Sequence, residues 1–172
     1  MLQLSEAQAT TQAARLAQVR PELQRAYSVA LGRWKGDRQL MLLGLPIVVE
    51  GYRSNAVQAA YYAQGRQSLA AINRLRANVG LPAFPVGSAE AGRKVTYQLP
   101  GTSNHNRWPS WVVDVALLQP DGSLKWDAGA LLLFARLMRA ADPRITWGGD
   151  WDRDGRTDDE RLNDWPHFEL TV

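Results

Sequence analysis

The chain has 172 residues, of which 45% are hydrophobic and seven are Trp, and its formal charge is +3 at neutral pH. This length and hydrophobic content suit one globular domain with a substantial core. The absence of Cys excludes disulfides, Cys-ligated zinc, iron–sulfur clusters and thiol nucleophiles, so any metal site must use His and carboxylate ligands. Lys and Arg are scattered among acids and no nucleic-acid recognition motif accompanies them, so we expect no nucleic-acid partner.

The amino-terminal region predicts a pair of helices. Small and apolar residues recur at helical spacing from Ser5, a suitable N-cap, to about Val19, and a second helix starts at Pro21 and runs towards Trp34. We expect residues 1–35 to form a helical pair packed on a single domain that spans 1–172. Charged residues throughout this region exclude a signal peptide or membrane span. Its basic side chains either contact an anionic wall or form a solvated helix face: Arg15, Arg20, Arg25, Arg33 and Lys35.

The middle of the chain predicts a strand, a turn and two helices. The run "LPIVVEGYRS" is β-branched, Ser54 is a suitable cap for a helix ending near Gly65, and "SLAAINRLRANVG" predicts another helix. A connection rich in Pro and Gly follows, with one strand expected at 94–99. Such a long irregular stretch often lines a functional site.

The last third predicts the strand "WVVDVALL", the turn "PDGS", the helix "DAGALLLFARLMRAA", and the strands "RITWGG" and "HFELTV" on either side of an acidic loop. The order of strands and helices favours an α+β fold with a small, mainly antiparallel sheet flanked by helices.

An aspartate interrupts the apolar strand "WVVDVALL". Strand alternation puts Asp114 on the same face as Val112 and Ala116. Because an unpaired buried carboxylate costs several kcal/mol, Asp114 needs an Arg or backbone partner, exposure at a strand end, or a bound cation. His105 stands nine residues earlier in a loop that can fold back towards the strand. Two metal ligands from one segment are therefore feasible.

The second and last histidine follows Pro166 and opens a strand, so His167 and Glu169 point one way and Phe168 the other. Two imidazoles and one carboxylate satisfy three corners of tetrahedral zinc and leave the fourth for a water that ionises near pH 7. Asp164, three residues before His167, is positioned to accept a proton without coordinating the metal. Taken alone, His167 would be better interpreted as an ordinary core or surface histidine, and the metal hypothesis depends on both histidines having an Asp at short range.

Several motifs together carry a resemblance, in the order "EGYRS", "YYAQGR", "PGTSNH", "VVDVA", "WGGDW" and "PHFEL". They resemble the peptidoglycan zinc peptidases that comprise D-alanyl-D-alanine carboxypeptidases and L-alanyl-D-glutamate endopeptidases, phage endolysins among them. The match covers roughly residues 46–170. It implies a Hedgehog/DD-peptidase-like fold.

The resemblance also implies roles for particular residues. His105, Asp114 and His167 resemble the zinc ligands, and Asp164 resembles the general base. Arg53 is similar to the arginine that faces the substrate carbonyl and developing oxyanion, for which a fixed guanidinium is suited; the alternative is that it caps a helix or is an ordinary surface residue. Ser103 matches a serine near the metal and is a candidate substrate contact, whereas three further matches are interpreted as structural: Gln58, Gln64 and Arg66. The commonest pattern is H-x-x-G-x-A-x-D, and "HNRWPSWVVD" is longer and has no glycine.

The acidic loop has the spacing D-x-D-x-D-G-x-x-D, which matches part of a calcium loop. Its twelfth position is Arg161 rather than Glu. The alternatives are that the "WGGDW" turn holds the first aspartate and that arginines solvate the loop. A calcium ion there would order the segment that leads to Asp164. The candidate calcium ligands are Asp150, Asp152, Asp154, Asp158 and Glu160.

We therefore expect a zinc metallopeptidase that hydrolyses peptidoglycan stem peptides, in the manner of an endolysin-like, bacteriolytic L-alanyl-D-glutamate endopeptidase. The alternatives are a D-alanyl-D-alanine carboxypeptidase and a non-catalytic, metal-stabilised wall-binding module. We further expect zinc, with calcium as a second candidate, bacterial peptidoglycan as partner, a monomer, and no stable membrane insertion. Without a signal peptide, a phage protein of this kind would be made in the host cytoplasm and reach the wall after release by a holin or membrane damage.

Overall fold

The computed structural model describes residues 2–171 of the chain, and these fall into two compact units. Unit 1 is Met1–Tyr52 together with Trp108–Val172, and unit 2 is Arg53–Arg107. The single domain expected over 1–172 stays a prediction. None of the helices in the described part of the chain has the length and hydrophobicity needed to span a bilayer.

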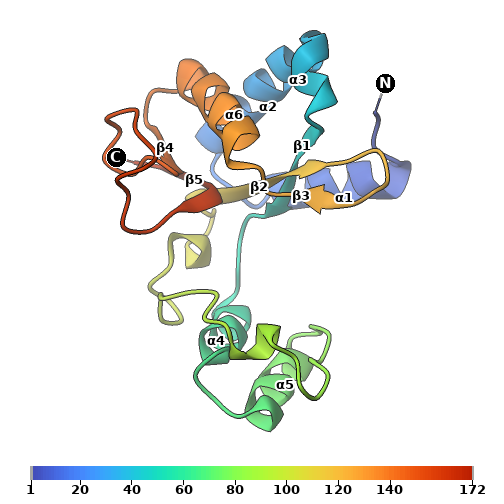
Figure 1. The fold of residues 1–172 in the computed structure, drawn as a ribbon, viewed down its shortest axis with the longest axis vertical. Coiled ribbons are helices and arrows are strands. Elements are labelled where there is room, and N and C mark those ends of the chain that lie inside the picture. Colours follow the sequence, from blue (N-terminus) through green and yellow to red (C-terminus); the bar gives the residue numbers. More distant parts are fainter. Residues whose placement is uncertain (1, 172) are drawn as a thin grey trace. The chain divides into compact units, whose positions relative to one another are not determined.

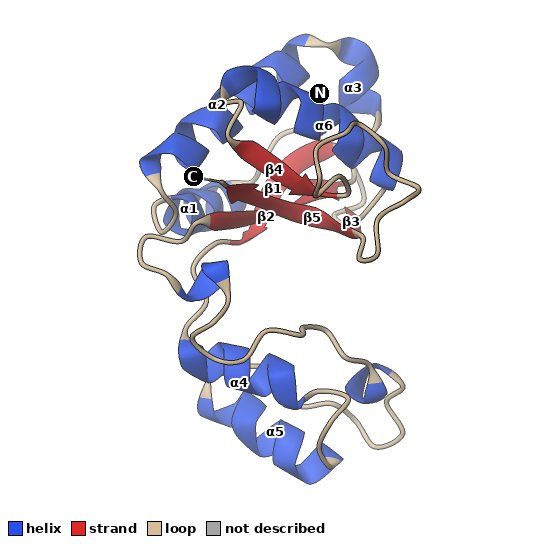
Figure 2. Ribbon diagram, turned by 90° about the vertical axis from the view of Figure 1, so that its left-hand side faces the viewer, coloured by secondary structure: helices blue, strands red, loops and turns tan. Residues whose placement is uncertain are grey.

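Unit 1 is built on an antiparallel sheet with the strand order β1-β2-β5-β4 (Figure 2). The short strand β3 extends the hairpin of β2. This sheet, flanked by helices, confirms the predicted α+β class. The strands are β1 (Leu45–Glu50), β2 (Val112–Leu118), β3 (Leu124–Lys125), β4 (Ile145–Gly148) and β5 (Asp164–Leu170).

Helices α2 (Pro21–Gly36) and α6 (Ala128–Ala141) pack side by side over one face of this sheet (Figures 1 and 2). Phe134 of α6 lies at the centre of their interface with the sheet. Its ring makes edge contacts with Tyr27 at 5.9 Å, Trp34 at 5.7 Å and Phe168 of β5 at 5.9 Å between centroids. Such aromatic pairs stabilise a core beyond the area they bury, and this cluster fixes β5 against α6.

The predicted amino-terminal helices are confirmed as α1 (Glu6–Leu16) and α2, followed by a short helix that the sequence did not indicate, α3 (Arg38–Leu42). Ser5 and Gln8 form a capping box at the start of α1. The helix also protects the edge of the sheet, because the Gln12 amide accepts from the Val48 backbone amide at 2.7 Å and donates to its carbonyl at 2.6 Å. An edge strand bonded in this way cannot pair with another chain there.

Unit 2 contains α4 (Asn55–Ala63), α5 (Leu69–Asn78) and the short 3₁₀ turns η1 (Glu90–Gly92) and η2 (Asn104–Asn106). Ser54 and Ser68 cap the two α-helices, and the cap at Ser54 was predicted. The strand expected at 94–99 was wrong, since no strand lies in this segment. The main-chain carbonyls of Thr96 and Gln98 instead accept hydrogen bonds from side chains of the α4 region.

The start of β5 also differs from the prediction. The strand begins at Asp164 rather than at His167, so it contains Pro166. The pairing with β4 shifts register between Trp147 and Gly148, and this irregularity accommodates the proline, which has no amide to donate to a ladder. The predicted strand extended to Val172, which lies outside the described residues.

Candidate active site

Strand pairing in unit 1 brings Asp114 and His167 together. Asp114 of β2 stands directly opposite His167 of β5 in the antiparallel register. The neighbouring Val113 and Phe168 point to the opposite face and belong to the core under α2 and α6. The alternation predicted for both strands is therefore confirmed, and an imidazole and a carboxylate share the sheet face that lies away from these helices.

Three carboxylates surround the His167 ring. Its Nδ1 lies 3.5 Å from Asp114 Oδ1 and 3.8 Å from Asp164 Oδ2, whereas its Nε2 lies 3.2 Å from Glu169 Oε2. Only the contact with Glu169 falls within the ordinary range of an N–H···O hydrogen bond. Two zinc ligands at about 2.1 Å in a tetrahedral site stand about 3.4 Å apart. The spacing of Nδ1 and the Asp114 oxygen therefore fits two ligands of one zinc ion.

These carboxylates also set the charge of the imidazole. Burial disfavours the charged ring and acts to lower the pKa of His167, but the carboxylates of Asp114 and Glu169, with the charge of Asp164, outweigh it and raise that pKa to about 10. The negative potential thus favours a cation at this position. A proton meets that demand in the metal-free protein, and a divalent ion would have to displace it.

Strand β4 and the loop that follows it hold Asp164 beside His167. Trp147 Nε1 donates to the Trp165 carbonyl at 2.6 Å, and the Trp151 ring packs against the His167 ring at 5.2 Å between centroids. Gly148 permits this approach, since a Cβ there would overlap the carbonyl oxygen of Asp164 and lie 3.0 Å from its Cβ. The Asp164 side chain is 46% exposed. It is therefore accessible to a substrate while fixed near the imidazole.

The remaining residues of the predicted centre lie in unit 2. His105 lies on η2, and its carbonyl accepts from the Arg53 amide at 2.9 Å. The Arg53 guanidinium donates to Gln58 Oε1 at 2.9 Å and stacks over Tyr61, with its central carbon 4.9 Å from the ring centroid. Unit 2 therefore brings together His105 and Arg53 from segments far apart in sequence.

Ser103 was predicted as a substrate contact. Its side chain is buried, and the hydroxyl accepts from the His105 amide at 3.2 Å. This hydrogen bond gives Ser103 a part in shaping the His105 turn. Its contact with substrate stays a prediction.

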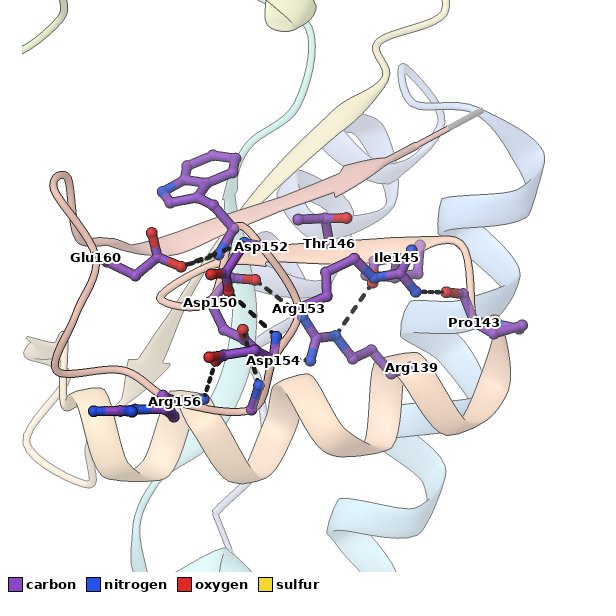
Figure 3. Close-up of polar contacts among 12 residues, drawn as sticks. Arg139, Pro143, Ile145, Thr146, Asp150, Asp152, Arg153, Asp154, Arg156 and Glu160 are labelled. Carbon is purple, nitrogen blue, oxygen red and sulfur yellow. Dashed lines mark hydrogen bonds and ion pairs between the residues drawn. The ribbon is translucent and has the colours of Figure 1, made fainter.

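Hydrogen bonds and ion pairs with other protein groups engage the carboxylates of the acidic loop (Figure 3). Asp150 is 1% exposed, and it accepts from Arg139 Nη1 of α6 at 2.6 Å and from the Gly155 amide at 3.2 Å. Oxygens of Asp150, Asp152 and Asp154 lie within 4.8 Å of one another. That proximity agrees with the predicted calcium loop, but Arg139 already neutralises its most buried carboxylate.

The other two candidate calcium ligands have partners of their own. Glu160 Oε1 accepts from the Trp151 amide at 2.5 Å and closes the loop across its base. Asp158 is exposed and pairs with Arg156 at 3.5 Å. Protein groups therefore already bond to these candidate ligands, and calcium binding stays a prediction.

Glu169 is the member of this cluster to which the sequence gave no role. Strand alternation placed it on the face of His167, and that was the available signal. Its significance depends on the 3.2 Å contact with Nε2, because that contact leaves Nδ1 facing Asp114. A histidine that binds a metal through one nitrogen usually donates the other N–H to a carboxylate or carbonyl.

Comparison with known proteins supports the same interpretation. The chain is 28% identical over 131 residues to the peptidoglycan L-alanyl-D-glutamate endopeptidase CwlK of Bacillus subtilis, a match that covers 72% of this chain and 59% of that protein. The crystal structure of the Serratia marcescens L-Ala D-Glu endopeptidase ChiX superposes with a TM-score of 0.51 at 25% identity, covering 93% of this chain and 86% of that one. The predicted resemblance to peptidoglycan endopeptidases is confirmed.

The chain thus spans about 59% of the length of the curated relative. No protein-family model matches it. The sequence relative and the solved structure agree on the same enzyme class.

Replacing Gly148 by Ala should displace Asp164 and destabilise the fold, because the added Cβ would overlap the Asp164 carbonyl. Overpacking of this kind costs about 1–3 kcal/mol. Urea denaturation of the full-length protein measures the change in the free energy of unfolding. Gly32→Ala is the matched control, since a Cβ there meets nothing within 4 Å and the position is helical. Equal unfolding midpoints for Gly148→Ala and wild type would contradict this account.

The raised pKa of His167 predicts how the metal-free protein responds to pH. Because the folded-state pKa of about 10 exceeds the ordinary value of 6.5, the protonated ring stabilises the fold fully below pH 6.5, and this contribution is lost as the pH rises to about 10. In the presence of chelator, the difference in unfolding free energy between wild type and His167→Gln should therefore shrink from pH 6 to pH 10. A difference that stays constant or grows would show that the carboxylates do not hold the proton.

Proposed function

We propose that this chain is a zinc-dependent peptidoglycan hydrolase that cleaves the L-alanyl–D-glutamate bond of stem peptides. The observation that carries the proposal is the 3.5 Å spacing between His167 Nδ1 and Asp114 Oδ1, with Asp164 beside them. This donor set suits zinc rather than magnesium or calcium, which prefer oxygen ligands alone. The likeness to two L-alanyl-D-glutamate endopeptidases supports the choice of bond.

His105 is the third ligand in this proposal. It precedes Trp108, where the chain re-enters unit 1, by only three residues. Trp108 packs against Tyr52, the last residue before the chain leaves unit 1, with ring centroids 5.0 Å apart. Short covalent connections of this kind limit the distance between His105 and β2, since each residue spans at most about 3.6 Å. Two imidazoles and a carboxylate then complete the ligand set.

A zinc ion held by these ligands supplies Lewis-acid chemistry, which polarises a carbonyl group and acidifies water. Asp164 acts as the general base in the proposal, since its carboxylate is fixed near the ligands and is 46% exposed. It accepts the proton of the attacking water and passes it to the amine that leaves. Arg53 donates to the oxyanion that develops on the carbonyl, and Gln58 orients its guanidinium for that task.

Glu169 is a positioning residue in the proposal. By accepting the Nε2 proton of His167, its carboxylate selects the tautomer in which Nδ1 carries the lone pair that would bind a metal. It also makes that nitrogen more basic, which strengthens its bond to a cation. The side chain is 19% exposed, so solvent screens the contact only in part.

A D-alanyl-D-alanine carboxypeptidase would use the same ligands and base, and remains the second candidate because the motifs in the sequence are similar to both activities. The remaining expectations belong to the proposal as well. They are a monomer that acts on bacterial wall after release from the cytoplasm of a phage-infected host, with calcium as a second candidate ion.

Digestion of purified peptidoglycan followed by mass spectrometry tests the activity. We expect fragments cut after L-Ala, with a new D-Glu amino terminus, and no products in the presence of chelator. Asp164→Ala should retain zinc but lose activity by about 10²–10⁴-fold, the usual contribution of a general base. Loss of a terminal D-Ala would favour the carboxypeptidase instead. Undiminished function of Asp164→Ala would favour a non-catalytic, metal-stabilised wall-binding module.

Replacing Glu169 by Gln should weaken zinc binding by about 10–100-fold, the usual effect of losing a carboxylate that orients a metal-binding histidine. Competition with a chromophoric chelator measures the zinc dissociation constant independently of activity. Glu6→Gln removes the same charge from the exposed face of α1 and is the control. If both variants bind zinc as tightly as wild type, Glu169 does not position the imidazole.

A further inference from the structure

The expectation from the sequence that Lys and Arg are scattered among acids was wrong for the chain as a whole, because the net charge of +3 conceals a strong segregation between the two units. Unit 2 contains seven Arg and Lys side chains and a single acid, Glu90, which gives it a formal charge of +6. Unit 1 holds the other 13 basic and 16 acidic side chains, a formal charge of −3. At most one cation of unit 2 can be neutralised by a carboxylate of its own unit. Such a field attracts anionic polymers.

Exposed apolar side chains accompany this charge on one loop of unit 2. The loop follows η1 and is the yellow-green segment in Figure 1. Val95 is 51% exposed, Tyr97 67% and Leu99 52%, and the adjoining Arg93 and Lys94 are exposed as well. We call these five residues the docking strip. Apolar groups gathered on a surface in this way mark interaction sites more often than singly exposed ones do.

The loop that carries the docking strip is anchored to the body of unit 2. The buried Gln58 donates to Thr96 Oγ1 at 3.1 Å and to the Gln98 carbonyl at 2.7 Å, and Arg66 donates to the Thr96 carbonyl at 2.9 Å. The Arg66 guanidinium also lies 5.9 Å from the Tyr97 ring centroid. The main chain at Thr96 and Gln98 is therefore bonded to the body of unit 2, and the docking strip is held ready for a partner at little further entropic cost.

We propose that the docking strip binds the peptidoglycan polymer itself, away from the bond that is cleaved. Arg93 and Lys94 would pair with carboxylates of the stem peptides, and Tyr97, with its apolar ring and polar hydroxyl, would pack on a sugar face. This inference rests on the proposed function, which supplies the identity of the polymer. From the sequence alone, the basic amino-terminal helices were candidates for a wall contact. The proposal places that contact in unit 2 instead, since the helices belong to unit 1, whose net charge is negative.

Sedimentation with purified, teichoic-acid-free peptidoglycan tests the proposal. The full-length, zinc-loaded Asp164→Ala protein serves as the parent, so that the wall stays intact. Adding Arg93→Gln with Lys94→Gln should weaken binding about tenfold, since two surface ion pairs contribute together about 1.4 kcal/mol. Tyr97→Ser should also weaken it, and raised salt should weaken binding by the parent. Arg33→Gln with Lys35→Gln removes the same charge from exposed positions in unit 1 and should leave binding within about twofold.

Three results would contradict the proposal that the docking strip binds peptidoglycan. One is unchanged wall binding of the Arg93/Lys94 variant, and another is an equal loss in the Arg33/Lys35 control, which would make the effect one of overall charge. The third is binding to vesicles of phosphatidylglycerol that depends on the docking strip while wall binding does not, which would assign it to a membrane. With Asp164 intact, cleavage of a soluble stem peptide should be equal in wild type and the Arg93/Lys94 variant. Wall binding without any cleavage would refute the proposed function and leave the docking strip standing.

Discussion

The pairing of β2 with β5 is the constraint on which the candidate site depends. It sets Asp114 opposite His167 on the sheet face that lies away from α2 and α6. A carboxylate in an otherwise apolar strand is expensive unless a cation compensates it, and the imidazole across the ladder supplies a position for one. The hydrophobic face of the same two strands, fixed by the aromatic cluster around Phe134, determines the register in which the polar face meets.

The surroundings of His167 divide its two nitrogens between two tasks. Glu169 contacts Nε2 at hydrogen-bond distance, whereas Asp114 and Asp164 face Nδ1 at longer distances. The distance from Asp114 suits two ligands that share one ion, and Asp164 lies near enough to take up a proton beside them. Gly148 lets the backbone of Asp164 come close enough for this arrangement. Stability and chemistry are therefore coupled, since the same carboxylates that favour a metal also retain a proton on the metal-free ring.

Opposite charges separate along the chain in a way that suits the proposed wall hydrolase. Unit 1 carries the acids that a cation site needs and a net negative charge, while unit 2 carries most of the uncompensated cations. Arg53 belongs to the basic unit, where Gln58 and Tyr61 fix it. In the proposed function, a polymer rich in carboxylates would meet a complementary field there before any specific contact forms.

The sequence by itself determined the elements and their polarity. Periodicity and capping residues predicted α1, α2, α4, β2 and β5, and strand alternation predicted which neighbours share a face with Asp114 and with His167, because these features depend on local spacing. The strand expected at 94–99 failed, since side chains of Gln58 and Arg66 take the main-chain bonds that a neighbouring strand would need.

Only the tertiary structure decided which groups meet. The register that sets Asp114 across from His167, the contact between Glu169 and Nε2, and the capture of Asp150 by Arg139 join residues through pairing and packing that no local pattern specifies. The segregation of charge was also present in the sequence, but it had no meaning until the fold divided the chain into units. Contacts between distant segments depend on the whole core, because the free energy that holds them comes from burial across many elements.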